Sequence, residues 1–302
     1  MNPVSTGGAK VMESSMVSAA PLAPHAPVQA STDAQLVALW LHGRPATTQR
    51  AYAREVRTFL SAVGKPLAAV TLGDLQAFAD GRGHLAPATR ARTLHAVKSL
   101  LAFGQRIGYL PFNVGAPLRI PGSRNTLAER ILPETDVHRL IALEPGVRNH
   151  ALLRLFYAAG VRVAELCGLR WRDTQPRDDG GQITVWGKGQ RTRAVVLPAG
   201  AWRELAALRG DAGGDDPVFR SRKRGALSTA QAWRIVRAAA QRAGVELPVS
   251  PHWLRHAHAS HALDRGEPIH LVQATLGHAS VATTGKYLHA RPTESSGKYL
   301  AV

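Results

Sequence analysis

Apolar residues in positions 31–113 recur at the spacings of three and four that are typical of helices. One helix is predicted to start at a cap formed by Thr47 or Thr48, and others follow Thr71 and Pro87. The apolar face of the first of these consists of Tyr52, Val56, Phe59, Leu60 and Val63. We therefore expect this part of the chain to fold as a helical domain.

The pattern changes from about residue 131 onward. Helices are predicted over residues 132–143, 151–160 and 161–169, the first of them starting at Thr135 or Asp136. Residues 182–198 have β-branched residues on both sides of a Gly-Lys-Gly turn, which predicts a hairpin of two short strands. Helical sequence returns from about residue 200. The fold class expected is mainly α, with a small antiparallel β-hairpin inside an α+β domain.

Composition, together with the positions of prolines and glycines, divides the chain further. Residues 1–30 are rich in Ala, Pro and Ser and lack an apolar period, which predicts a disordered tail. Residues 114–130 contain two prolines and two glycines, which predicts a linker between the helical domain 31–113 and a second domain, 131–302. No apolar run approaches the length of about 20 residues that a bilayer needs, and we read no export signal, so a cytoplasmic protein is expected.

The net charge of the chain indicates what kind of molecule it binds. The chain has 38 Lys and Arg against 21 Asp and Glu, a net charge of +17, and its pI is about 11.1. Such an excess favours a polyanion, and nucleic acid is the obvious one. Two predicted helices carry basic residues on a second face, and the linker carries another. A solvated charged face is the ordinary explanation of such residues, but they are also candidates for phosphate contacts. The candidates are Arg50, Arg54, Arg57, Arg90, Arg92, Lys98 and Arg124.

The candidate chemistry lies in the second domain. Its residues are Arg162, Lys188, His252, Arg255, His278 and Tyr287. Two arginines can clamp a phosphate through planar, permanently charged forks. A phenol can attack phosphorus, a lysine can protonate the departing oxygen, and histidines can donate hydrogen bonds or shuttle protons. The set contains no carboxylate cage for a metal, so we expect neither a metal nor another cofactor.

These residues lie in segments that resemble the motifs of the tyrosine recombinases, the phage integrase family. The segments are GVRVAEL, WGKGQRTRAVVLP, PHWLRH and LGHASVATTGKYLH, in that order along residues 131–290. Residues 31–113 also resemble the helical core-binding, SAM-like domain of these enzymes. The resemblance implies a site-specific DNA recombinase in which Tyr287 forms a 3′-phosphotyrosyl link and releases a 5′-hydroxyl, without ATP or metal. It also implies four protomers on two duplexes that carry specific sites, with a paired recombinase as a possible partner.

Several alternatives stay open at this point. Tyr299 repeats the GKYL context of Tyr287, but it lies near the end of the sequence and lacks a following histidine. His252 and His256 have the spacing of zinc ligands on a helix, although a structural hydrogen bond is the better reading of His256. Glu165 is expected to brace the site, and Arg193 to contact DNA or the protein itself. The competing functions are a type IB topoisomerase and a catalytically silent, DNA-binding architectural factor.

Overall fold

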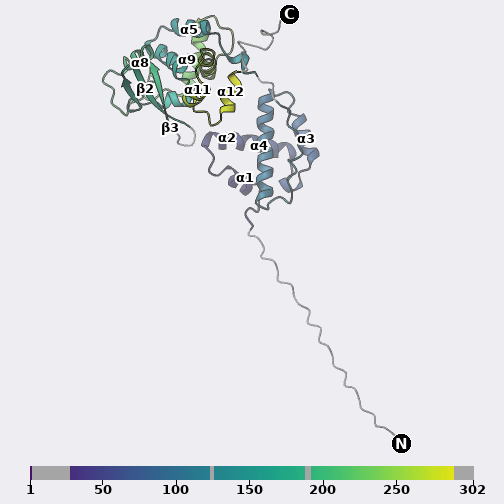
Figure 1. The fold of residues 1–302 in the computed structure, drawn as a ribbon. Helices are drawn as coiled ribbons and strands as arrows, with labels where there is room; N and C mark the ends of the chain where they lie inside the picture. Colours follow the sequence, from purple (N-terminus) through teal and green to yellow (C-terminus); the bar gives the residue numbers. More distant parts are fainter. Residues whose placement is uncertain (2–27, 123–125, 188–191, 289–302) are drawn as a thin grey trace, which may run out of the picture. The chain divides into compact units, whose positions relative to one another are not determined.

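The computed structural model describes residues 1, 28–122, 126–187 and 192–288 (Figure 1). The chain divides into two compact units, Met1–Arg124 and Asn125–Val302, and the division falls inside the segment predicted as a linker. Most of the predicted tail, Arg124, Lys188 and Tyr299 lie outside the described residues.

The first unit is helical. Its elements are α1 (Asp33–Leu41), α2 (Ala46–Val63), the short 3₁₀ turn η1 (Leu67–Ala69), α3 (Leu72–Asp80) and α4 (Pro87–Arg106). The predicted cap of α3 is confirmed, because the Thr71 hydroxyl accepts from the Asp74 backbone N–H while the Asp74 carboxylate accepts from that of Thr71. The predicted cap of α2 is wrong. Pro45 occupies the cap position and the helix starts at Ala46, so both threonines fall inside the first turn.

The start of the predicted linker is packed against this unit. Val114 and Leu118 are buried in the same core as Phe59 and Leu100. The Lys98 ammonium of α4 donates to the carbonyls of Ala116 and Leu118. The chain therefore continues as part of the helical unit to at least residue 118.

The second unit combines helices with a small sheet. It contains η2 (Ala128–Arg130), α5 (Glu134–Ala142), α6 (Val147–Ala159), α7 (Val163–Gly168), η3 (Trp171–Asp173), β1 (Thr174–Arg177), β2 (Gly180–Trp186), β3 (Thr192–Pro198), α8 (Ala199–Ala206), α9 (Thr229–Arg242), α10 (Pro251–Asp264), α11 (Ile269–Leu276) and α12 (Val281–Leu288). The strands form an antiparallel sheet in the order β1-β2-β3, with Ile183 opposite Val195. The fold class expected from the sequence, mainly helical with a small antiparallel sheet, is confirmed.

Two details of this unit differ from the prediction. Strand β1 was not predicted, because its sequence TQPR has no apolar alternation and it pairs only along one edge of β2. Helix α5 starts at Glu134 with Pro133 in the cap position, so neither Thr135 nor Asp136 begins it.

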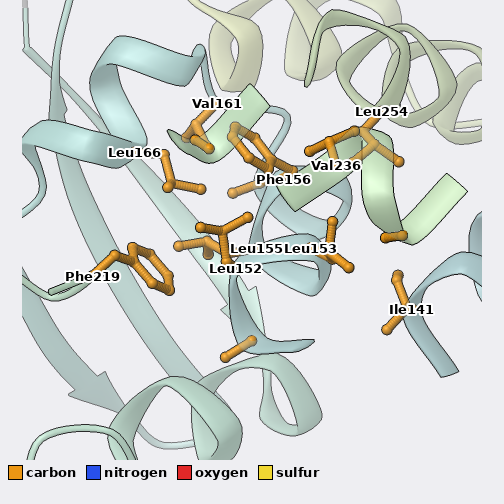
Figure 2. Packing of buried hydrophobic residues seen from close by; sticks show 14 of the residues in the cluster. Ile141, Leu152, Leu153, Leu155, Phe156, Val161, Leu166, Phe219, Val236 and Leu254 are labelled. Atoms are coloured by element: carbon orange, nitrogen blue, oxygen red, sulfur yellow. The ribbon is translucent and has the colours of Figure 1, made fainter. Parts of the chain in front are cut away.

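Helix α6 runs through the core of the second unit (Figure 2). Leu152, Leu153, Leu155 and Phe156 are all essentially inaccessible to solvent, so a broad apolar face of this helix is buried. It packs against α5, α8, α10 and β3. The turn that follows it is therefore anchored in the core of the unit, and that turn carries Arg162.

Candidate active site

Arg162 is fixed by a turn that requires glycine. Helix α6 ends at Gly160, whose φ of +57° lies in the left-handed region. A Cβ at this position would lie 2.7 Å from His258 Cδ2 and 2.8 Å from Leu276 Cδ2, so a larger residue would collide with both. Arg162 then caps α7, and its backbone N–H donates to Glu165 Oε2 at 2.8 Å. Its guanidinium donates to Glu165 Oε1 at 2.7 Å and to the Gly277 carbonyl at 3.3 Å.

Glu165 is a buried carboxylate between two arginines. Its side chain is 4% exposed, and Arg193 of β3 donates to both of its oxygens, at 3.0 and 2.8 Å. Burial alone would raise the pKa of Glu165. The hydrogen bonds from Arg193 and Arg162 outweigh burial and lower the pKa to about 2. Glu165 is thus ionised at neutral pH and braces both guanidinium groups, as the sequence led us to expect.

Arg255 lies deeper than Arg162. It belongs to α10, is 3% exposed, and donates to the carbonyls of Gly160 and Leu276, the latter at 2.6 Å. Burial, together with the positive charge of Arg162, lowers its pKa to about 10. It nevertheless stays charged at neutral pH, and the two carbonyls fix the plane of its guanidinium.

Two histidines flank the phenol of Tyr287. His256 Nδ1 lies 2.7 Å from Tyr287 Oη, and the His278 ring stacks parallel to the Tyr287 ring with centroids 6.4 Å apart. His278 Nδ1 is in turn 2.9 Å from Thr284 Oγ1 on α12. Burial lowers the pKa of both histidines to about 4, with neighbouring positive charges adding to the effect. Both rings are therefore neutral at pH 7 in the protein without DNA.

His252 stacks on His256 one helical turn away, with ring centroids 6.0 Å apart. Burial of part of its ring, and the charges of Arg255 and Arg162, lower its pKa as well. Among the described residues, no group of three or more His, Cys, Asp or Glu side chains has an arrangement that could hold a metal ion. The zinc reading of this pair gains no support from the geometry.

Tyr287 lies on α12 and is 5% exposed, packed with Ile131, Val272 and Leu276. Burial raises the pKa of its phenol, and the nearby charge of Arg255 acts in the opposite direction. The structure thus brings together Tyr287 and the predicted residues Arg162, Arg255, His252 and His278. The remaining predicted residue, Lys188, lies outside the described part of the chain.

The role of Arg193 was left open by its sequence context, although the pattern along the strand contains a signal. Val195 and Leu197 are buried, and residues two apart on a strand point to the same face. Arg193 shares that face, so its side chain is directed toward the protein interior.

The candidate DNA contacts of the helical unit have different surroundings. Arg50 and Arg57 are exposed on α2. Arg54 and Arg92, from α2 and α4, each donate to Glu55 Oε1 at 3.0 Å, and the buried Glu55 also accepts from Thr93 at 2.7 Å. Two of the candidates make other contacts: Arg90 lies 3.7 Å from Asp80, and Lys98 binds carbonyls.

Most of the chain is similar to known proteins of one family. Residues 130–294 match the phage integrase family. The tyrosine recombinase XerC of Xylella fastidiosa (strain 9a5c) is 36% identical over 263 residues, covering 82% of this chain and 87% of that protein. The protein of the same name from Mycobacterium bovis (strain BCG / Pasteur 1173P2) is 33% identical over 269 residues, covering 82% and 89%.

Solved structures share the fold. XerH site-specific recombinase, bound to a palindromic difH substrate after cleavage, has a TM-score of 0.73 at 22% identity, covering 90% of this chain and 85% of that one. A lambda integrase dimer bound to a COC′ core site has a TM-score of 0.72 at 19% identity, covering 87% and 95%.

The family match and these relatives identify an enzyme that performs site-specific recombination. The chain belongs to the phage integrase family, and its relatives place it among the tyrosine recombinases. The family expected from the sequence motifs is thereby confirmed. Within the described residues, every helix is too short or too polar to cross a membrane.

Proposed function

We propose that this protein cleaves and rejoins duplex DNA at specific sites through a 3′-phosphotyrosyl intermediate formed by Tyr287. The observation that supports the proposal best is electrostatic. Arg162, Arg193 and Arg255 surround the single carboxylate of Glu165, so these four side chains carry a net charge of two positive units. The neighbouring histidines are neutral at pH 7, so they do not add to that charge. A partly buried excess of positive charge is complementary to an anion, and a scissile phosphate is an anion that fits.

The arginines would stabilise the transition state with little reorganisation. Arg162 and Arg255 are each held by protein oxygen atoms before any substrate arrives. In this account their remaining N–H groups take the nonbridging phosphate oxygens, whose charge increases as Tyr287 attacks. Prepositioned donors of this kind contribute about 3 kcal/mol each to transition-state stabilisation.

The chemical step exchanges one ester for another. Tyr287 Oη forms a bond to phosphorus, the bond to the 5′-oxygen breaks, and the phenol proton passes to His256 Nδ1, which is already 2.7 Å away. Lys188 donates a proton to the departing 5′-oxygen, while His252 and His278 donate hydrogen bonds to the phosphate. Because the ester keeps the bond energy, a 5′-hydroxyl of a second strand can reverse the step on a new partner without ATP or metal.

Tyr287 must be uncovered before it can react. The residue is 5% exposed, so little of it is open to a phosphate while α12 keeps this position. DNA binding is therefore expected to move α12 or to turn the side chain. Such a step would keep the nucleophile unreactive in the absence of DNA.

The helical unit would supply further phosphate contacts. Arg50 and Arg57 extend from one helix, and Arg54 with Arg92 form a pair around Glu55. A lambda integrase tetramer bound to a Holliday junction shares this fold, with a TM-score of 0.67 at 18% identity. We propose that four protomers exchange strands between two duplexes in the cytoplasm, alone or with a paired recombinase. The outcome would be integration, excision or resolution of mobile DNA or replicon dimers.

The proposal can be tested with a nicked duplex. Binding sites are selected from random-sequence duplexes with the full-length protein, and a nick is placed beside the cleavage position so that the released fragment diffuses away. The wild-type protein should accumulate a covalent adduct on this duplex. Tyr287→Phe should give none, whereas Tyr157→Phe, which alters another tyrosine that hydrogen-bonds a histidine, should still form it. Relaxation of supercoiled plasmid that lacks the selected site would favour the topoisomerase alternative.

A further inference from the structure

Three successive backbone carbonyls at the end of α11 each accept a hydrogen bond from a different arginine. The pairs are Thr275 with Arg193 (2.6 Å), Leu276 with Arg255 (2.6 Å) and Gly277 with Arg162 (3.3 Å). The last carbonyls of a helix have no partner inside the helix and carry the negative end of its dipole, so cations are favourable there. His278 is the next residue. The three arginines therefore fix the turn from which His278 extends.

Of these arginines, Arg193 is the one whose three nitrogens all donate to the protein. Its Nε donates to the Thr275 carbonyl, and Nη1 and Nη2 donate to the two oxygens of Glu165. Its side chain is 12% exposed. With three of its five N–H groups bonded to the protein and little of the side chain exposed, the guanidinium offers a DNA phosphate little access. The structure thus favours the protein contact over the DNA contact among the two roles that the sequence left open.

The two partners of Arg193, Glu165 and Thr275, are each close to a residue that would act on the phosphate, Arg162 and His278 respectively. Glu165 binds the Arg162 guanidinium at 2.7 Å and the Arg162 backbone N–H at 2.8 Å. Thr275 lies three positions before His278. One guanidinium therefore connects the α7 side of the site, with Arg162, to the α11 side, with His278. A displacement of about 1 Å between reacting groups can reduce a rate by about 100-fold, so such a connection matters for chemistry.

We propose that Arg193 is a positioning residue that sets the placement of Arg162 relative to His278, and that it does so without touching DNA. The inference rests on the proposed function, because it concerns the same phosphate site. Its chemical requirement is the planar fork. A lysine keeps the charge but offers a single nitrogen, which cannot bind both Glu165 oxygens and the Thr275 carbonyl in the same geometry.

The test separates binding from chemistry. Single-turnover adduct formation at saturating protein and equilibrium affinity are both measured on the selected nicked duplex. Arg193→Lys should lower the adduct rate by about 10- to 100-fold while the Kd for the duplex changes less than about twofold. Arg177→Lys, on the exposed strand β1 of the same sheet, is the matched control and should change neither. A weaker Kd with an unchanged rate would mean that Arg193 contacts DNA directly, and the proposal would be wrong.

A second variant and a double mutant guard against a folding defect. Gly277→Ala keeps every charge. Its Cβ would lie 3.1 Å from Arg193 Cδ and Nη1, and the φ of +63° strains any side chain at this position, so the variant disturbs the Arg193 contact and the turn that holds His278. It should reproduce the loss of rate at unchanged Kd. In a His278→Ala background, the effect of Arg193→Lys should shrink to less than about threefold, because the placement of His278 no longer matters. Additive effects would overturn the inference. A wild-type protein that forms no adduct would refute the proposed function instead.

Discussion

The charge of Glu165 is expected to contribute strongly to the stability of the second unit. Its pKa is about 2 in the folded protein against an ordinary value of 4.5, and its side chain is 4% exposed. A difference of this size corresponds to about 3 kcal/mol of folding free energy at pH 7. Glu165→Gln, which keeps the shape and removes the charge, should therefore lower the free energy of unfolding by about that amount.

The pH dependence follows from the direction of the shift. A carboxyl group whose pKa is lowered on folding stabilises the protein fully above its unfolded pKa, and this contribution disappears as pH falls toward the folded pKa. The difference between wild type and Glu165→Gln should therefore be about 3 kcal/mol at pH 7 and shrink to about 1 kcal/mol at pH 3. Below pH 2 the two proteins should unfold alike with respect to this group.

Urea unfolding followed by tryptophan fluorescence is a suitable assay. All tryptophans except Trp40 belong to the second unit, so the signal reports mainly on the unit that contains Glu165. Asp215→Asn, which removes an exposed carboxylate paired with Arg172, is the control and should change stability by less than about 1 kcal/mol. If Glu165→Gln were as stable as wild type at pH 7, or if the difference did not depend on pH, the electrostatic reasoning would be refuted.

Three further predictions concern the rest of the site and the helical unit. Arg255→Lys should reduce single-turnover adduct formation by about 100-fold, because one nitrogen cannot hold the carbonyls of Gly160 and Leu276 and a phosphate together. NMR titration of the DNA-free protein should show His256 and His278 neutral down to about pH 4, and stability should fall as pH drops from 6.5 toward 4; titration of either near 6.5 would contradict the burial argument. Glu55→Gln should weaken DNA binding roughly fivefold in anisotropy measurements if Glu55 positions Arg54 and Arg92, whereas added positive charge alone would tighten it.

Much of the fold was predictable because it follows local rules. The helical period, the cap at Thr71 and the end of α6 near residue 160 all depend on neighbouring residues. The errors arose where tertiary context or proline decides. Pro45 and Pro133 displaced the threonine and aspartate caps, and strand β1 exists only because β2 offers it an edge.

The candidate site residues could be predicted from their residue types and their spacing in the sequence motifs, but their contacts depended on the fold. The sequence identified Arg162, Arg255 and Tyr287, yet it gave no indication that Tyr287 would be buried against His256. It also could not show that Arg193 and Glu165, 28 positions apart, would meet in a bidentate pair. Those contacts join distant segments, so only the packed structure specifies them.

The proposed mechanism requires that one particular atom, Tyr287 Oη, holds the cleaved strand. Peptide mass spectrometry of the adduct formed on the nicked duplex, combined with chemical analysis of the DNA ends, identifies that atom. We predict a phosphodiester between Tyr287 and the 3′ end of the cleaved strand, a free 5′-hydroxyl, and full yield in the presence of EDTA. A free 3′-hydroxyl, attachment to any other residue, or a requirement for magnesium would contradict the central claim.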